Sequence, residues 1–161
     1  MMVRFSILVA LLYTLSLHSL VAQELKFLTP SVAKVHEGAA PVVASTYEIY
    51  FKKKKNQSLT IDSIKSISDE KKLDFFVAKK RSSKEYKRTE ANKISPEEKG
   101  NFRLYFNTIT LLGDELPPAY SEENKPIQYD MSKGVRIYLT LSGKKQTAVI
   151  KSFKETKTVM P

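Results

Sequence analysis

Residues 133–153 read KGVRIYLTLSGKKQTAVIKSF and contain the clearest β-hairpin pattern in the chain. Apolar residues alternate with polar ones, with the period of two that is typical of a half-buried strand, at Val135, Ile137, Leu139 and Leu141. Residues 146–153 supply the second strand. Residues 142–145 supply the turn, in which Gly143 can adopt the positive φ that a tight reversal needs. The hairpin predicts an antiparallel sheet with one apolar face.

The same alternation predicts strands outside the hairpin. It is clear at residues 46–52, 73–78 and 102–108, and weaker at residues 25–29 and 58–64. The apolar residues of the three clear segments lie on one side of each strand, so we expect them to face a common core.

Helical signals are few. Ser95-Pro96-Glu97-Glu98 resembles a helix start, but Gly100 ends it after about one turn, so this segment is expected to be a connector. Long loops are predicted at residues 79–101, which are charged, and at residues 113–126, which contain three prolines.

Short strands with long connections predict an all-β fold, a single antiparallel, immunoglobulin-like β-sandwich. A small barrel is the alternative fold. The chain has no Trp and no Cys, so the core residues typical of antibody domains are missing.

Residues 1–22 have the pattern of a secretory signal peptide. A single base, Arg4, precedes an apolar run, and the small residue Ala22 lies just before Gln23. A membrane anchor is the alternative, but a spanning helix needs about 20 apolar residues, and polar residues interrupt this run. We therefore expect an exported protein, periplasmic or secreted from a bacterium, with residues 23–161 forming one domain that does not span a membrane.

The charge is strongly positive and unevenly distributed. The formal net charge is +10, and the bases concentrate in residues 52–55, 79–99 and 144–157, whereas residues 114–123 are acidic. A basic exported protein is expected to bind an anionic polysaccharide or lipid, or an envelope protein. Nucleic acid is not an expected partner, because export and the acids among the bases of residues 84–98 argue against it.

The sequence gives little support for a catalytic or metal site. His36 is the one histidine outside residues 1–22, no Cys is present, and no G-x-S-x-G or phosphate-binding glycine motif occurs. Paired carboxylates, such as Asp114-Glu115 and Glu122-Glu123, lack the order of a calcium loop and are expected to be solvated. No catalytic residue, metal or cofactor is therefore predicted.

Tyrosine and arginine recur on the predicted outward sides of the strands, and these residue types are favoured at contact surfaces. The predicted binding residues are Tyr50, Lys52, Arg103, Tyr105, Arg136 and Tyr138. A shared binding face requires sheet pairing that brings their three strands together. The competing explanation is that tyrosine and arginine simply cover an exposed sheet.

Two triplets suggest sugar attachment. Asn56-Gln57-Ser58 satisfies the N-x-S rule, and Asp62-Ser63-Ile64 resembles an O-linked acceptor of some exported bacterial proteins. The sequence as a whole predicts an exported, non-enzymatic binding module at the bacterial cell envelope. The alternatives are a carboxylate-based hydrolase on the same fold and a structural or assembly component of the envelope.

Overall fold

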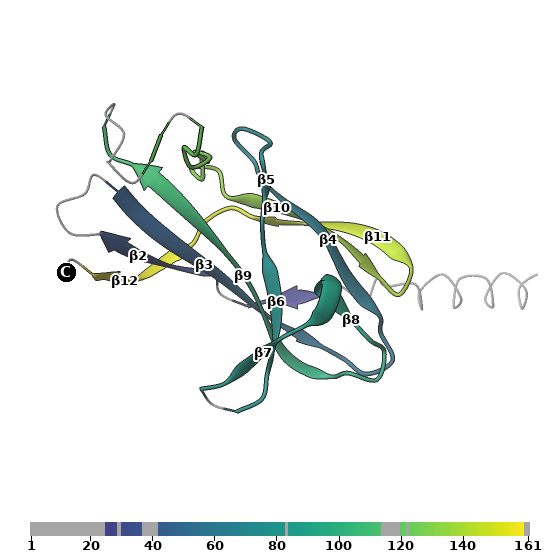
Figure 1. Ribbon diagram of the computed structural model, residues 1–161. Helices are drawn as coiled ribbons and strands as arrows, with labels where there is room; N and C mark the ends of the chain where they lie inside the picture. Colours follow the sequence, from purple (N-terminus) through teal and green to yellow (C-terminus); the bar gives the residue numbers. More distant parts are fainter. Residues whose placement is uncertain are drawn as a thin grey trace, which may run out of the picture.

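The computed structural model of the chain describes residues 25–28, 30–36, 42–82, 84–113, 120–121 and 123–159. These residues form an all-β structure of two packed sheets (Figure 1). Residues 1–22, the expected signal peptide, lie outside the described residues, as do Asp114, Glu115 and Glu122 of the acidic segment.

The larger sheet is built around two long antiparallel strands. Its order is β12 (Lys154–Val159), β2 (Ser31–His36), β3 (Val42–Lys53), β9 (Gly100–Leu111), β6 (Phe76–Lys80) and β7 (Tyr86–Arg88), and β1 (Lys26–Phe27) also pairs with β3. The β12–β2 pair is parallel, so the expectation of a wholly antiparallel fold is wrong at this edge.

The smaller sheet contains the hairpin of residues 133–153. Its order is β11 (Lys144–Ile150), β10 (Val135–Leu141), β4 (Leu59–Ser66) and β5 (Lys72–Leu73), and β8 (Lys93–Ile94) also pairs with β4. Leu141 pairs with Lys144, so the turn is the two residues Ser142 and Gly143, and both have positive φ (49° and 79°). This is the type I′ geometry that suits the twist of a hairpin.

One apolar core fills the space between the sheets. The larger sheet contributes stacked aromatic pairs, Tyr47 with Phe106 at 4.9 Å and Phe51 with Phe102 at 5.6 Å between ring centroids. The smaller sheet contributes aliphatic residues such as Ile137, which is fully buried. The alternation of β3, β9 and β10 was therefore interpreted correctly.

Two predicted strands are divided between the sheets. Residues 73–78 are not one strand, because Leu73 belongs to β5 of the smaller sheet and Val77 to β6 of the larger one. Residues 146–153 likewise end as a strand at Ile150. The chain then crosses over, placing Phe153 4.8 Å from Tyr47 between ring centroids, and continues as β12. Each crossing keeps its apolar residues directed at the same core.

The segment 79–101, predicted to be a loop, contains short ordered elements. They are β7, the 3₁₀ turn η1 (Glu90–Asn92) and β8. Residues 95–99 form a turn without a helix, as expected for a connector. These elements shape one end of the molecule, where β6 and β7 of the larger sheet lie opposite β4 and β8 of the smaller one.

Candidate functional site

The six predicted binding residues do not form one surface. Tyr50 and Lys52 lie on β3, and Arg103 and Tyr105 lie on the neighbouring β9, all on the outer face of the larger sheet. Arg136 and Tyr138 lie on β10, on the outer face of the smaller sheet. The core separates these two faces, so the strand pairing that a shared face requires is not formed.

Glu48 links the residues of the larger sheet. Its carboxylate accepts a hydrogen bond from the Tyr50 hydroxyl and an ion-paired hydrogen bond from Arg103 Nη1, both at 2.6 Å. Burial, together with this hydrogen bond to a carboxylate, raises the pKa of Tyr50 to about 12. The Tyr50 phenol is therefore held as a neutral donor.

Aromatic rings from neighbouring strands cover the same face. The Arg103 guanidinium carbon lies 4.4 Å from the ring centroid of Tyr86 on β7 and 4.9 Å from that of Tyr105. Arg88 lies 3.5 Å from the ring centroid of Phe76 in the same manner. Sequence reasoning missed Tyr86 and Arg88, because β7 has only three residues and shows no period. Phe76, on β6, was also not predicted as a binding residue. On this face, the aromatic rings and the guanidinium groups largely contact one another.

The residues on the smaller sheet also have internal partners. Arg136 pairs with Glu70 at 2.7 Å, and the Thr140 hydroxyl donates to Asp62 at 2.9 Å. Asp62 lies at a register shift between β4 and β10, beside the partly buried Ser63, which is opposite Tyr138. The Thr140–Asp62 contact joins adjacent strands, as cross-strand pairs do, and the Arg136–Glu70 pair joins β10 to the turn between β4 and β5.

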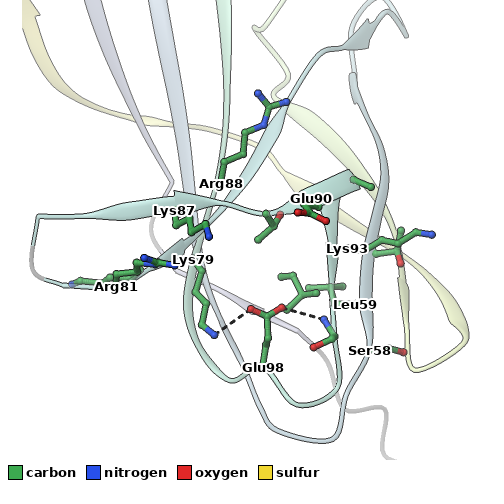
Figure 2. A pocket seen from close by; sticks show the side chains of 15 residues that line it. Ser58, Leu59, Lys79, Arg81, Lys87, Arg88, Glu90, Lys93 and Glu98 are labelled. Carbon is green, nitrogen blue, oxygen red and sulfur yellow. Dashed lines mark hydrogen bonds and ion pairs between the residues drawn. The ribbon is translucent and has the colours of Figure 1, made fainter.

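A basic cleft of about 960 Å³ opens at the end of the molecule where β6 and β7 face β4 and β8 (Figure 2). Its basic lining residues are Lys79, Lys80, Arg81, Lys87, Arg88 and Lys93, and its acidic ones are Glu90 and Glu98. Apolar Leu59 and Ile94 also contribute to the lining. The sequence had identified residues 79–99 as basic, but it did not indicate that they enclose a cleft.

The strand register explains how the bases are placed. Lys79 pairs with the buried Phe102 on one side and with Lys87 on the other, so these two lysines lie on the inward side of the larger sheet. Lys93 approaches from β8, on the smaller sheet. Lys80, which pairs with Tyr86, and Arg88 lie on the outer side of the sheet, and in Figure 2 Arg88 points away from the other labelled bases.

The charges of the cleft are only partly compensated. Within the described residues, Lys80, Arg81, Lys87 and Lys93 form no ion pair. Glu98 pairs with Lys79, Nζ to Oε1 at 3.2 Å, and its Oε2 accepts the backbone N–H of Ser95 at 3.3 Å. The excess positive charge suits an anionic ligand, because walls of one sign raise the local concentration of the opposite charge.

Lys53 stabilises this end of the molecule from the inner side of β3. It continues the inward side of β3, is 1% exposed, and its Nζ donates to the carbonyls of Ser95 (2.8 Å) and Glu98. Burial lowers the pKa of Lys53. The carbonyls satisfy the buried ammonium, so Lys53 acts as an anchor for the turn at residues 95–98.

Of the remaining predicted features, the N-x-S triplet borders this cleft, because Ser58 lines it and the Asn56 N–H donates to the Pro96 carbonyl at 2.8 Å. Asn56 occupies an exposed turn with a φ of 63°. His36 ends β2, which β3 and β9 separate from β6 in the larger sheet. No cluster of three or more metal-ligating side chains occurs among the described residues. In the part of the chain that the structure describes, no helix has the length and apolar character to cross a membrane.

Comparison of the chain with protein-family models, with curated proteins and with solved structures found no match.

Proposed function

We propose that this protein is an exported, non-enzymatic binding domain with an immunoglobulin-like β-sandwich fold. In this proposal it acts at the bacterial cell envelope and binds an acidic polysaccharide in the basic cleft. The observation that carries the proposal is the set of uncompensated bases around one cleft, Lys80, Arg81, Lys87 and Lys93.

The distribution of these bases favours a polymer over a single small anion. They come from β6, β7, β8 and the segment after β6, and they line the cleft instead of converging on one point. Repeated charges along an acidic polysaccharide can contact such bases in succession. The apolar side chains of Leu59 and Ile94 in the lining fit the carbon faces of sugar rings.

Neither a hydrolase nor a protein-binding domain is favoured by the structure of the cleft. Of its two carboxylates, Glu98 is held by Lys79 and Ser95, which leaves no free pair for the acid and base of a hydrolase. A protein partner on the outer face of the larger sheet would have to use rings and guanidiniums that already contact one another.

The binding test measures affinity for polygalacturonate at increasing salt. Because the Debye length falls from about 10 Å at 0.1 M to about 3 Å at 1 M, we expect binding to weaken steeply. A Lys87→Gln/Lys93→Gln variant should lose about tenfold or more in affinity, and a Lys72→Gln/Lys133→Gln variant, with the same net charge, should lose much less. Absence of binding by the folded wild-type protein would contradict the proposed ligand.

Export is tested separately, by sequencing the N-terminus of protein recovered from the periplasm or the culture medium. The pattern of residues 1–22 leads us to expect a mature chain that begins at Gln23. A full-length chain that begins at Met1 in the membrane fraction would contradict the signal peptide and favour an anchor.

A further inference from the structure

Glu98 lies between the donors that an anionic ligand would need. One carboxylate oxygen accepts from Lys79 Nζ at 3.2 Å and the other from the Ser95 backbone N–H at 3.3 Å. Figure 2 shows this carboxylate within the cleft, with dashed lines to both donors. A side chain of the protein itself thus occupies two hydrogen-bond donors in a cleft whose other bases are uncompensated.

Several contacts hold the turn that carries Glu98 without using this carboxylate. Lys53 Nζ binds the carbonyls of Ser95 and Glu98, the Asn56 N–H donates to the Pro96 carbonyl at 2.8 Å, and the Glu98 N–H donates to the Ser95 carbonyl at 3.2 Å. All of these contacts use the backbone of the turn. The Glu98 side chain can therefore swing away while Ser95 keeps its position.

The two donors are arranged for an oxyanion. They already bind the two oxygens of one carboxylate, so their spacing matches a carboxylate, sulfate or phosphate group of a ligand. Lys87, the register partner of Lys79, adds a further positive charge beside them. Breaking the ion pair also costs little free energy. The side chains of Lys79 and Glu98 are 35% and 34% exposed, and solvated ion pairs contribute little to stability.

We infer that Lys79 Nζ and the Ser95 N–H form an oxyanion subsite of the cleft, which Glu98 occupies until an acidic group of the ligand displaces it. The inference rests on the proposed function, because it takes the acidic polysaccharide as the source of that group. Glu98 then acts as an internal competitor. It lowers the affinity for every anion and keeps the subsite closed to weakly charged molecules.

The test compares Glu98→Gln with Glu97→Gln in polygalacturonate binding at fixed salt. Both substitutions remove one negative charge from the same turn, but Glu97 makes no ion pair with Lys79 among the described contacts. Glu98→Gln should bind about three- to tenfold more tightly, because competition is lost, whereas Glu97→Gln should change affinity less than about twofold. Adding Lys79→Gln to Glu98→Gln should remove most of the gain.

The outcomes separate this inference from the proposed function. If the wild type binds and the two Glu variants tighten binding equally, only the overall charge matters and the subsite is disproved. If the wild type binds and Glu98→Gln does not bind more tightly, Glu98 is not a competitor. If the folded wild type and both variants fail to bind, the proposed function itself fails.

Discussion

Adjacent residues of β10 have opposite environments, and this contrast is the most direct test of the hairpin register. Ile137 is fully buried in the core, and Tyr138 lies half-buried on the outer face of the smaller sheet. We expect Ile137→Ala to lower the free energy of unfolding by about 2–5 kcal/mol, as cavity-forming changes do. Tyr138→Ala should cost much less. Urea denaturation measures both, and a greater loss for Tyr138→Ala would mean that the register is inverted.

Tyr50 offers a test of the contacts on the larger sheet. Its pKa of about 12 exceeds that of an ordinary tyrosine, about 10, because burial and the Glu48 carboxylate disfavour the phenolate. The native protein therefore keeps a proton that the unfolded chain releases. The stabilisation is fully present below about pH 10 and is lost as the pH rises through about 12.

The titration of Tyr50 can be isolated by subtraction. The ultraviolet phenolate absorbance of Tyr50→Phe, subtracted from that of the wild type, should give a curve whose midpoint is about 12. Circular dichroism over the same range establishes that both proteins remain folded. A difference curve with its midpoint at about pH 10 would show that the Glu48 carboxylate does not bind the Tyr50 hydroxyl.

At the scale of elements, two glycines flank β10 and have nearly the same backbone conformation. Gly143 in the hairpin turn has a φ of 79°, and Gly134 just before the strand has a φ of 80°. A Cβ at Gly143 would have no neighbour within 4 Å, whereas at Gly134 it would lie 1.9 Å from the Ile150 carbonyl oxygen. The backbone of β11 lies across Gly134, so no side chain fits there without displacement of that strand.

The two alanine substitutions should therefore differ. Gly143→Ala adds only the strain of a positive φ, about 1 kcal/mol, while Gly134→Ala adds the same strain and a backbone clash. We expect the melting temperature to fall by several degrees more for Gly134→Ala. Equal decreases in melting temperature for the two variants would show that the backbone of β11 does not approach Gly134 closely.

Most elements found from sequence are long enough to show a period, although the two-residue β1 lies in the weakly predicted segment 25–29 and the six-residue β2 was not predicted. The alternation of Tyr47, Ile49 and Phe51 in β3 identified the inward side because every second residue is buried. Strands β5, β7 and β8 have two or three residues and show no period. Strand β12 (KETKTV) is polar because it is an edge strand that pairs through its backbone with β2.

The candidate site was predicted only in part, because local sequence patterns do not show which strands pair. The alternation placed Tyr50, Arg103, Arg136 and Tyr138 on outer faces, but whether they share a face depends on which strands pair. That pairing is long-range, since β3 joins β9 while β10 joins β4. The cleft similarly requires Lys79 and Lys93 to come from different sheets, and local sequence carries no signal for this arrangement.

For the whole molecule, the strand pairing brings the basic residues 52–55 and 79–99 to one end together with Lys144 and Lys145, whereas Lys151 of the third basic stretch lies at the other end. Lys53 pairs with Gly100, and Leu59 pairs with both Ile94 and Leu141, so the turns that follow or precede these residues lie together. The Ser142 N–H also donates to the carbonyl of Ser58, which lines the cleft. In Figure 1 the loop near β5 lies at the opposite end from β7 and β8. The positive charge is therefore polarised towards the cleft.

This polarity predicts that the location of a lysine matters more than its charge. One variant replaces the exposed cleft-end lysines Lys54, Lys55, Lys144 and Lys145 with Gln. The control variant makes the same change at the exposed opposite-end lysines Lys72, Lys125, Lys133 and Lys151. Both proteins have the same net charge, so any difference between them reports the distribution of charge.

We expect the cleft-end variant to lose about tenfold or more in affinity for polygalacturonate at low salt, and the control to lose less than about threefold. These lysines contact no ligand in our proposal, and they act by raising the potential around the cleft. The effect of the quadruple substitution should therefore disappear at about 1 M salt, where the Debye length is about 3 Å. The loss of affinity caused by Lys87→Gln/Lys93→Gln should persist in part. Equal losses in the two quadruple variants would mean that the ligand responds only to net charge, and the cleft would no longer be favoured over any other basic surface of the protein.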